Sequence, residues 1–415
     1  MKTNISQQLL DTRQGREAND ILRACVHCGF CTATCPTYQL LGDELDSPRG
    51  RIYLIKEILE GQKPTIETQK HLDRCLTCRS CESTCPSGVQ YGRLVDIGRE
   101  IVEKNVSRSL LDNAKRNLLN KIIPNPKLFR PLLMIGRLAK PILPSSIKRK
   151  IPIPQQTTNN WPAASHTRKM LILNGCVQPT LAPNINIATA RVLDSLGITV
   201  LRVSEAGCCG AVTHHLNKQE EAISHIKRNI DAWWPHIESG AECIVITASG
   251  CGTMLKDYGH LLIDDPEYAE RAKKISEISK DIVEILNTEG DKLNPLLSKL
   301  KKNPSKTISF HSPCSLQHGQ QIKGATEAIL ERAGFKLTNV TDPHLCCGSA
   351  GTYSILQPDL SQRLLKDKVR NLEAENPDTI VTANIGCLTH IQSGTKTRVQ
   401  HWIELIDQEL SRSNA

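Results

Sequence analysis

Three absences narrow the classes of protein to which this chain of 415 residues could belong. No apolar run approaches the roughly 18–20 residues that a membrane-spanning helix needs, so we expect no segment to cross a bilayer. The polar, charged N-terminal segment lacks the apolar core of an export signal, which predicts a protein that is not exported. Aromatic residues make up only 3% of the chain and no nucleic-acid recognition motif is present, which argues against a nucleic-acid partner.

The sequence also lacks a Gly-x-Gly-x-x-Gly fingerprint and any evident acid–base pair that could take a hydride from a substrate. We therefore expect no catalytic residues for substrate oxidation in this chain, and we expect a separate flavin-containing partner to meet the substrate. Cysteine, in contrast, is abundant. The 17 cysteines of a chain without an export signal favour metal binding over a disulfide framework, because the cytosol keeps thiols reduced.

Eight of these cysteines form two copies of one pattern, Cys-x-x-Cys-x-x-Cys-x-x-x-Cys-Pro, with an interval of 50 residues between matching positions. Such a repeat indicates a duplication. In two-cluster ferredoxins the cysteine before the proline binds the cluster of the other loop, whereas zinc sites usually pair two short Cys-x-x-Cys arms. The pattern therefore predicts two [4Fe–4S] clusters, one bound by Cys25, Cys28, Cys31 and Cys85 and the other by Cys75, Cys78, Cys81 and Cys35.

The residues around these motifs have the periodicity of helices. Between the two cysteine runs, Ser47 is suited to cap a helix, Pro48 to occupy its first turn and Gly61 to end it. Residues 6–23 also have a helical pattern. We therefore predict a helical two-cluster ferredoxin domain over residues 1–103.

The C-terminal half contains a second duplication, in which a Cys-Cys-Gly motif follows a single cysteine after 32 residues. The two sets are Cys176, Cys208, Cys209 and Cys251, and Cys314, Cys346, Cys347 and Cys387. Each group follows a short apolar strand pattern and precedes a helical one, which predicts two α/β lobes with parallel sheets over residues 166–290 and 304–415. The cysteines then lie at the carboxyl ends of strands, where open α/β sheets bind ligands. The remaining Cys243 is predicted to be a core residue.

These lobes resemble the cysteine-rich CCG domain of heterodisulfide reductases and related electron-transfer subunits. The full motif of that family ends in Cys-x-x-Cys, and the resemblance implies five thiolates for a noncubane iron–sulfur cluster. Met254 and His390 occupy the fifth position here. Methionine and histidine can both bind metals, so further iron–sulfur clusters in the lobes stay possible beside lobes that have lost metal and act as scaffold.

The positive charge is concentrated in one segment. The chain has a net charge of +9, yet residues 104–150 alone contain 12 Lys and Arg and a single acid, Asp112. Leucines and isoleucines alternate with these charges and prolines interrupt them, which predicts short basic amphipathic helices within a linker over residues 104–165. Such helices suit an anionic membrane surface or an acidic partner, and they could equally cover a lobe and leave their charges in water.

Taken in order, these motifs make the chain resemble the iron–sulfur subunits of bacterial glycolate oxidase (glycolate dehydrogenase) over nearly its whole length. The segments that carry the resemblance include ACVHCGFCTATCPTY, CLTCRSCESTCPSGVQYGRL, GCCGAVTHH, HSPCSLQHGQ and NIGCLTH. The resemblance implies FAD-containing partner subunits that oxidise glycolate to glyoxylate, and D-lactate less well. It also implies that this chain passes electrons toward the quinone pool from the cytoplasmic face of the inner membrane.

Related families leave other functions open. The chain is also similar to the iron–sulfur subunits of lactate-utilising and anaerobic glycerol-3-phosphate dehydrogenases. A second hypothesis is a disulfide-reducing enzyme of the heterodisulfide reductase type, against which the missing fifth thiolates argue. A third is a membrane-docking scaffold without chemistry of its own.

Overall fold

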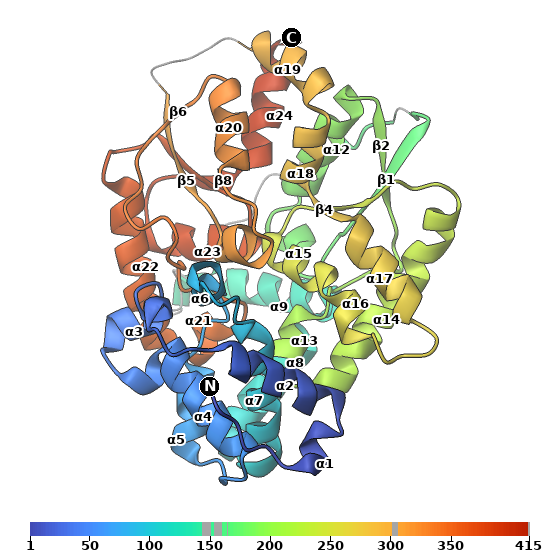
Figure 1. Ribbon diagram of the computed structural model, residues 1–415. Helices are drawn as coiled ribbons and strands as arrows, with labels where there is room; N and C mark the ends of the chain where they lie inside the picture. Colours follow the sequence, from blue (N-terminus) through green and yellow to red (C-terminus); the bar gives the residue numbers. More distant parts are fainter. Residues whose placement is uncertain (143–150, 153–159, 164, 301–305, 414–415) are drawn as a thin grey trace. The chain divides into compact units, whose positions relative to one another are not determined.

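The computed structural model describes residues 1–142, 151–152, 160–163, 165–300 and 306–413. The chain divides into two compact units. The first unit comprises Met1–Asn117, His215–Asn217 and His344–Lys368, and the second comprises Leu118–His214, Lys218–Pro343 and Val369–Ala415. The described strands all belong to the second unit (Figure 1).

The first unit is built from short helices around the two cysteine loops. They are α1 (Gln7–Leu10), α2 (Arg13–Ala24), α3 (Pro36–Leu41), α4 (Pro48–Leu59), α5 (Ile66–Asp73), α6 (Ser80–Thr84) and α7 (Tyr91–Asn105), with the 3₁₀ turns η1 (Phe30–Thr32) and η2 (Glu44–Asp46). Helix α8 (Leu110–Ile122) follows and continues into the second unit. The helical character predicted for the N-terminal domain is confirmed.

Helix α4 shows why the sequence folds this way. The Ser47 hydroxyl accepts a hydrogen bond from a backbone N–H of the first turn at 2.9 Å, and Pro48 occupies the first helical position. Gly61 follows the helix with a φ of +100°, a left-handed conformation that favours glycine. Helix α7 packs closely against α4 because Gly98 has no Cβ, which would lie 2.6 Å from the Ile55 side chain.

Two parallel four-stranded sheets form the framework of the second unit. Their orders are β2-β1-β3-β4 and β6-β5-β7-β8, so the strand order of the first sheet recurs in the second. The strands are β1 (Arg168–Ile172), β2 (Ile198–Arg202), β3 (Ile244–Ile246), β4 (Ser279–Asp281), β5 (Thr307–His311), β6 (Lys336–Leu337), β7 (Thr379–Thr382) and β8 (Val399–His401). All paired strands run parallel, which confirms the predicted duplication of an α/β lobe.

Helices connect and flank the strands of each sheet (Figure 1). In the first lobe they are α11 (Gln178–Leu181), α12 (Asn184–Ser195), α13 (Ala211–His215), α14 (Gln219–Glu238), α15 (Ser249–Lys256), α16 (Tyr258–Leu261), α17 (Ala269–Ile278), α18 (Ile282–Thr288) and α19 (Gly290–Ser298). In the second lobe they are the π-helix η4 (Ser315–Gly319), α20 (Ala325–Arg332), α23 (Ile385–Gly394) and α24 (Trp402–Ser413). Between β6 and β7 the chain also forms α21 (Tyr353–Leu356), which belongs to the first unit, and α22 (Pro358–Glu373), which begins there.

The two lobes contact each other inside the second unit. Ser249 Oγ, at the start of α15, lies 2.7 Å from Ser315 Oγ in η4, and His401 Nε2 lies 2.9 Å from the carbonyl oxygen of Thr247. Burial lowers the pKa of His401 to about 3, so the imidazole is neutral and its Nε2–H donates to that carbonyl. Cys243 is buried beside β3, which confirms the prediction that it is a core residue.

Candidate metal centres

The first cysteine loop lines a cavity together with a cysteine of the second loop. Cys25, Cys28 and Cys31 form one part of the wall, and Cys85 reaches it from the end of α6. Cys28 is exposed, Cys25 is buried and the other two are half-buried. The four thiols predicted to share a cluster therefore border one cavity, which Cys81 also touches.

The second cysteine loop lines a cavity of its own. Cys75, Cys78 and Cys81 border it, and Cys35 joins them from the residue before α3. Cys78 is half-buried and the other three are buried. The predicted second quartet thus also lines one cavity, and no thiol of this quartet is exposed.

The two loops have the same unusual backbone. His27 and Gly29 have φ values of 55° and 85°, and the matching residues Thr77 and Arg79 have values of 52° and 58°. Left-handed conformations are uncommon outside glycine, so their recurrence at matching positions indicates that the loop shape requires them. In the second loop the shape brings the Thr77 N–H to 3.4 Å from Cys75 Sγ, a hydrogen bond of the kind that supports cluster thiolates.

These observations fit two [4Fe–4S] clusters. The four thiols of each predicted quartet border one cavity and come from two separate loop segments, and none of the 17 cysteines forms a disulfide. Burial raises the pKa of Cys31 to about 11 and that of Cys81 well above its ordinary value. Without metal these thiols hold their protons, and iron binding must displace them.

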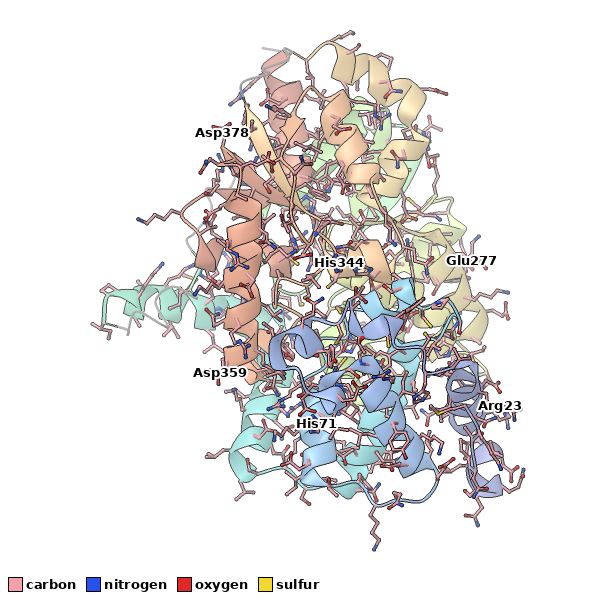
Figure 2. The ribbon with its side chains drawn as sticks, turned by 60° about the vertical axis from the view of Figure 1, so that its left-hand side comes forward. Arg23, His71, Glu277, His344, Asp359 and Asp378 are labelled. Atoms are coloured by element: carbon pink, nitrogen blue, oxygen red, sulfur yellow. The ribbon has the colours of Figure 1, made fainter. Side chains whose placement is uncertain are left out.

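A buried network of charges adjoins the second cavity. The carboxylate of Asp46, which is fully buried, lies 3.2 Å from Arg51 Nη2, 2.7 Å from Arg74 Nη1 and 3.1 Å from His71 Nδ1. Figure 2 shows His71 among the helices of the first unit. Two guanidinium groups share one carboxylate, so the network carries net positive charge.

Arg51 connects this network to the cluster cavity. Its side chain lines the second cavity, and its Nη1 donates to Thr37 Oγ1 at 3.1 Å. Thr37 Oγ1 in turn lies 3.3 Å from Cys35 Sγ. The sequence analysis did not identify Arg51; the one available signal was an arginine within the otherwise apolar face of the helix over residues 48–59.

The stretch that follows the second Cys-Cys-Gly motif belongs to the first unit. Tyr353 donates a hydrogen bond to the carbonyl oxygen of Arg74 at 3.1 Å, and Lys115 donates to the carbonyl oxygen of Ile355 at 2.7 Å. Burial raises the pKa of Tyr353, and the charges of Cys75 and Cys346 add to this effect. Tyr353 therefore connects the stretch after the second Cys-Cys-Gly motif to the residue that precedes Cys75.

The four cysteines of the first lobe form one group in the second unit. Hydrogen bonds from the thiols of Cys176 and Cys209 lower the pKa of Cys208 well below its ordinary value. Because the thiols of Cys176 and Cys209 donate to Cys208, their own pKa values are raised. The Cys209 thiol also interacts with Cys251. Four interacting cysteine side chains are a donor set suited to a thiophilic metal.

Two side chains that the sequence analysis did not identify hold the backbone of this group. Asn229 Nδ2 donates to the carbonyl oxygen of Cys208 at 2.8 Å, and Tyr258 Oη donates to that of Cys209 at the same distance. Both side chains are fully buried. These hydrogen bonds fix the backbone of the Cys-Cys-Gly turn, in the same way that residues around a metal site orient the residues that bind the metal.

Met254, at the position of the missing fifth cysteine, is part of the apolar core of the first lobe. Its Cε would lie 3.5 Å from a Cβ at Gly210, and Gly210 has a φ of +92°. Met254 therefore packs directly over the Cys-Cys-Gly turn. In the second lobe, His390 is half-buried in α23.

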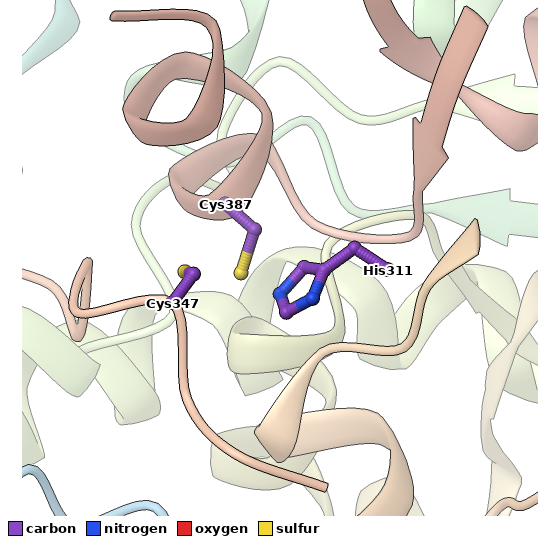
Figure 3. Close-up of side chains that lie close together, drawn as sticks. All are labelled: His311, Cys347 and Cys387. Carbon is purple, nitrogen blue, oxygen red and sulfur yellow. The ribbon is translucent and has the colours of Figure 1, made fainter. Parts of the chain in front are cut away.

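In the second lobe a histidine lies close to one of the predicted cysteines. His311, the last residue of β5, and Cys387, in α23, are both buried, and their ligand atoms lie within 4.8 Å (Figure 3). The third side chain drawn there, Cys347, comes from the stretch His344–Lys368. Cys314 directly precedes η4. Sequence reasoning overlooked His311, although it stands three residues before Cys314, where the first lobe has Leu173.

The basic segment forms helices that expose many of their apolar residues. Helix α9 (Pro126–Ala139) has no buried residue, and Ile135 and Leu138 are 61% and 80% exposed. Part of the charge in this segment is paired, since Arg108 and Arg116 both contact Asp73. Residues 143–150 of the predicted basic segment lie outside the described residues. No described helix has the length and apolar character required to span a membrane.

Comparison with known proteins agrees with this architecture. A model of the 4Fe-4S dicluster domain matches residues 21–89, and a model of the cysteine-rich CCG domain matches residues 170–256 and 308–392. The predictions of two [4Fe–4S] clusters and of two CCG lobes are thereby confirmed.

Three relatives illustrate the range of similarity. The chain is 53% identical to the glycolate oxidase iron-sulfur subunit of Escherichia coli (strain K12), over 99% of this chain and 100% of the relative. It is 29% identical to the probable glycolate oxidase iron-sulfur subunit of Bacillus subtilis (strain 168), over 92% of each chain. It is 27% identical to lactate utilization protein A of an Exiguobacterium species, over 57% of this chain and 96% of the relative.

Proposed function

The chain belongs to the family of glycolate oxidase iron–sulfur subunits, and we propose that it carries electrons from a flavoprotein that oxidises glycolate. As such it is a component of an oxidoreductase complex. The observation that carries the proposal is the pair of cavities in the first unit, each bordered by all four cysteines of one predicted quartet. A [4Fe–4S] cluster stores one electron, which suits it to a partner flavin that releases two electrons singly.

We assign the cluster ligands as the cavities suggest. Cys25, Cys28, Cys31 and Cys85 would hold the first cluster, and Cys75, Cys78, Cys81 and Cys35 the second. The loops supply thiolates and the Thr77 N–H supplies a hydrogen bond to sulfur. The domain limits that go with this assignment are 1–103 for the two-cluster domain, 104–165 for the linker, and 166–290 and 304–415 for the lobes.

The oxidation of substrate belongs to the partner in this proposal. Conversion of glycolate to glyoxylate releases two electrons and two protons, which an FAD-containing subunit would take up. D-lactate, another 2-hydroxy acid, would be a second substrate of the same partner. This chain would then receive the electrons and pass them to the quinone pool.

We further propose that helix α9 binds the anionic surface of the inner membrane on its cytoplasmic face. The helix presents exposed apolar side chains beside basic ones, and it has no acidic residue. Apolar burial and attraction to anionic lipid both strengthen interfacial binding of such a helix.

The first lobe supports an additional iron–sulfur centre. The thiols of Cys176 and Cys209 both interact with Cys208, and Cys209 also interacts with Cys251. We propose that these four cysteines bind iron, and that Cys314, Cys346, Cys347 and Cys387 form the corresponding set of the second lobe. A disulfide-reducing activity has less support, because a core methionine occupies the fifth position of the first lobe.

Iron counting with EPR spectroscopy tests the proposal on the anaerobically purified complex. Eight irons with two reduced [4Fe–4S] signals would account for the first unit alone, and additional irons would place clusters in the lobes. Oxidation of glycolate by the isolated chain, without any flavoprotein, would contradict the proposed division of labour.

A further inference from the structure

The two cysteine loops differ in what covers them, although their backbones match. Val26 and Phe30, in the first loop, are 67% and 60% exposed. Their counterparts 50 residues later, Leu76 and Ser80, are only 6% and 1% exposed. The first loop thus presents two large apolar side chains to solvent at positions that are buried in the second loop.

These apolar side chains surround an exposed cluster thiol. Cys28 lies between Val26 and Phe30 in the sequence, and all three residues border the first cavity. Cys28 is exposed, whereas its counterpart Cys78 is half-buried. We name the three residues Val26, Cys28 and Phe30 the first-loop rim. Exposed apolar groups gathered at one spot mark interaction sites, and here they surround the entrance to a redox centre.

The charges beside the rim favour a protein over a lipid surface as the occupant. Arg49 borders the same cavity, and its Nε lies 2.7 Å from Glu44 Oε1. This pair places both signs of charge next to the rim, whereas an anionic membrane attracts segments with basic charge alone. Apolar anchors with paired charges around them are typical of protein–protein interfaces.

We propose that the first-loop rim is the docking surface for the electron-donating flavoprotein subunit. The proposal rests on the proposed function, which requires such a partner. Docking there brings the donor next to the exposed thiol of the first cluster. The first quartet is then the entry point for electrons, and the second quartet, whose loop is covered by this chain, lies further along the path.

Serine substitutions in the full chain test the rim. We expect Val26→Ser with Phe30→Ser to weaken binding to the flavoprotein by about tenfold or more, as loss of central apolar anchors does. Reduction of the clusters by glycolate-reduced flavoprotein should slow accordingly, with iron content and the dithionite-reduced EPR spectrum unchanged. Ile66→Ser is the matched control, because Ile66 is 70% exposed in the same unit and borders neither cavity.

If the serine variants lose iron, hydrogen exchange in the unmodified protein provides an independent test. In the unmodified chain, hydrogen exchange should slow over residues 25–32 when the flavoprotein binds and stay unchanged over residues 75–82. Unaltered exchange at the rim would overturn the proposal, as would equal loss of binding in the Ile66→Ser control. Loss of vesicle binding with flavoprotein binding intact would assign the rim to the membrane instead. Failure of glycolate to reduce the clusters of the unmodified complex would contradict the proposed function itself.

Discussion

Cys85 borders the cavity of the other cysteine loop, which Cys25 also borders. It does not border the cavity lined by Cys75 and Cys78, which precede it in its own loop. The chain between them therefore crosses from one cavity to the other. This crossing makes the two candidate clusters depend on both loops, so that neither loop is sufficient for a cluster of its own.

The crossed arrangement predicts that Cys85→Ser and Cys78→Ser affect different clusters. Cys85→Ser should alter the EPR signal that Cys28→Ser also alters, because both thiols border the first cavity. Cys78→Ser should alter the other signal. The same signal changing in Cys85→Ser and Cys78→Ser would contradict the assignment.

Arg51→Met tests the buried charge beside the second cavity. We expect it to destabilise the protein by about 3 kcal/mol, because it leaves the buried Asp46 with one guanidinium partner fewer. The surface pair of Arg49 and Glu44 offers the comparison, where Arg49→Met should cost below about 1 kcal/mol. Denaturant unfolding of both variants measures the difference.

Arg51→Met should also lower the reduction potential of the second cluster. A nearby cation stabilises the more negative, reduced state, and its removal shifts the potential by roughly 50–100 mV at an effective dielectric constant of about 20. Potentiometric titration followed by EPR measures the shift. An unchanged potential, or a shift confined to the signal altered by Cys28→Ser, would contradict the placement of Arg51 at the second cavity.

The buried carboxyl group of Asp281, in β4, should make the stability of the protein depend on pH. Burial raises its pKa to about 7, above the value of about 4 in an unfolded chain. The raised pKa favours the protonated carboxyl, so its contribution to stability is present below pH 4 and declines as the pH rises to 7. Asp281→Asn keeps an oxygen that can accept from the Val283 N–H but cannot ionise.

We therefore expect Asp281→Asn to raise stability at pH 8 by about 2–4 kcal/mol relative to the unmodified protein. At pH 5 the gain should be smaller, about 1 kcal/mol, because the folded carboxyl is still mostly protonated there, and this pair of measurements is the internal control. Thermal or denaturant unfolding at both pH values checks the prediction. Equal effects at pH 5 and pH 8 would show that Asp281 does not titrate in this range.

Cys208→Ala tests metal binding in the first lobe. If the group around Cys208 binds iron, the variant should contain less iron than the unmodified protein and keep both signals of the first unit. Cys243→Ala is the matched control, because Cys243 is buried in the same lobe and belongs to none of the cysteine groups. Equal iron content in all three proteins would mean that the first lobe holds none.

Replacement of apolar residues on α9 tests the membrane proposal. Leu132, Ile135 and Leu138 are exposed, and changing them to serine should weaken binding to vesicles that contain anionic lipid by at least about tenfold. Ile263→Ser is a suitable control, because Ile263 is 54% exposed and lies outside the basic segment. Sedimentation with vesicles measures the binding. Equal binding by both variants would contradict a role for α9.

Spacing along the chain predicted the cysteine groups and the two kinds of fold well. A loop as short as Cys25–Cys31 can place its thiols on only a few atoms of one cluster. The intervals between cysteines are therefore sufficient to predict the cluster-binding groups. The parallel sheets followed similarly from short apolar runs such as that before Cys176, which alternate with helical patterns.

The residues that sequence reasoning missed act through contacts between distant parts of the chain. Arg51 reaches Thr37, and Tyr258 reaches Cys209 across 49 positions, without any periodic pattern that would mark them. The sequence also could not predict that Phe30 is exposed whereas Ser80 is buried. The two positions are related by the repeat, and only the surrounding fold distinguishes them.

The most direct test of the central claim is an anaerobic glycolate titration of the purified complex, followed by EPR. The account predicts that glycolate produces two reduced [4Fe–4S] signals when the flavoprotein is present and none when this chain is alone. Cys28→Ser and Cys78→Ser should each alter a different one of the two signals. Cluster reduction by glycolate without the flavoprotein, or a complex whose clusters glycolate does not reduce, would contradict the account.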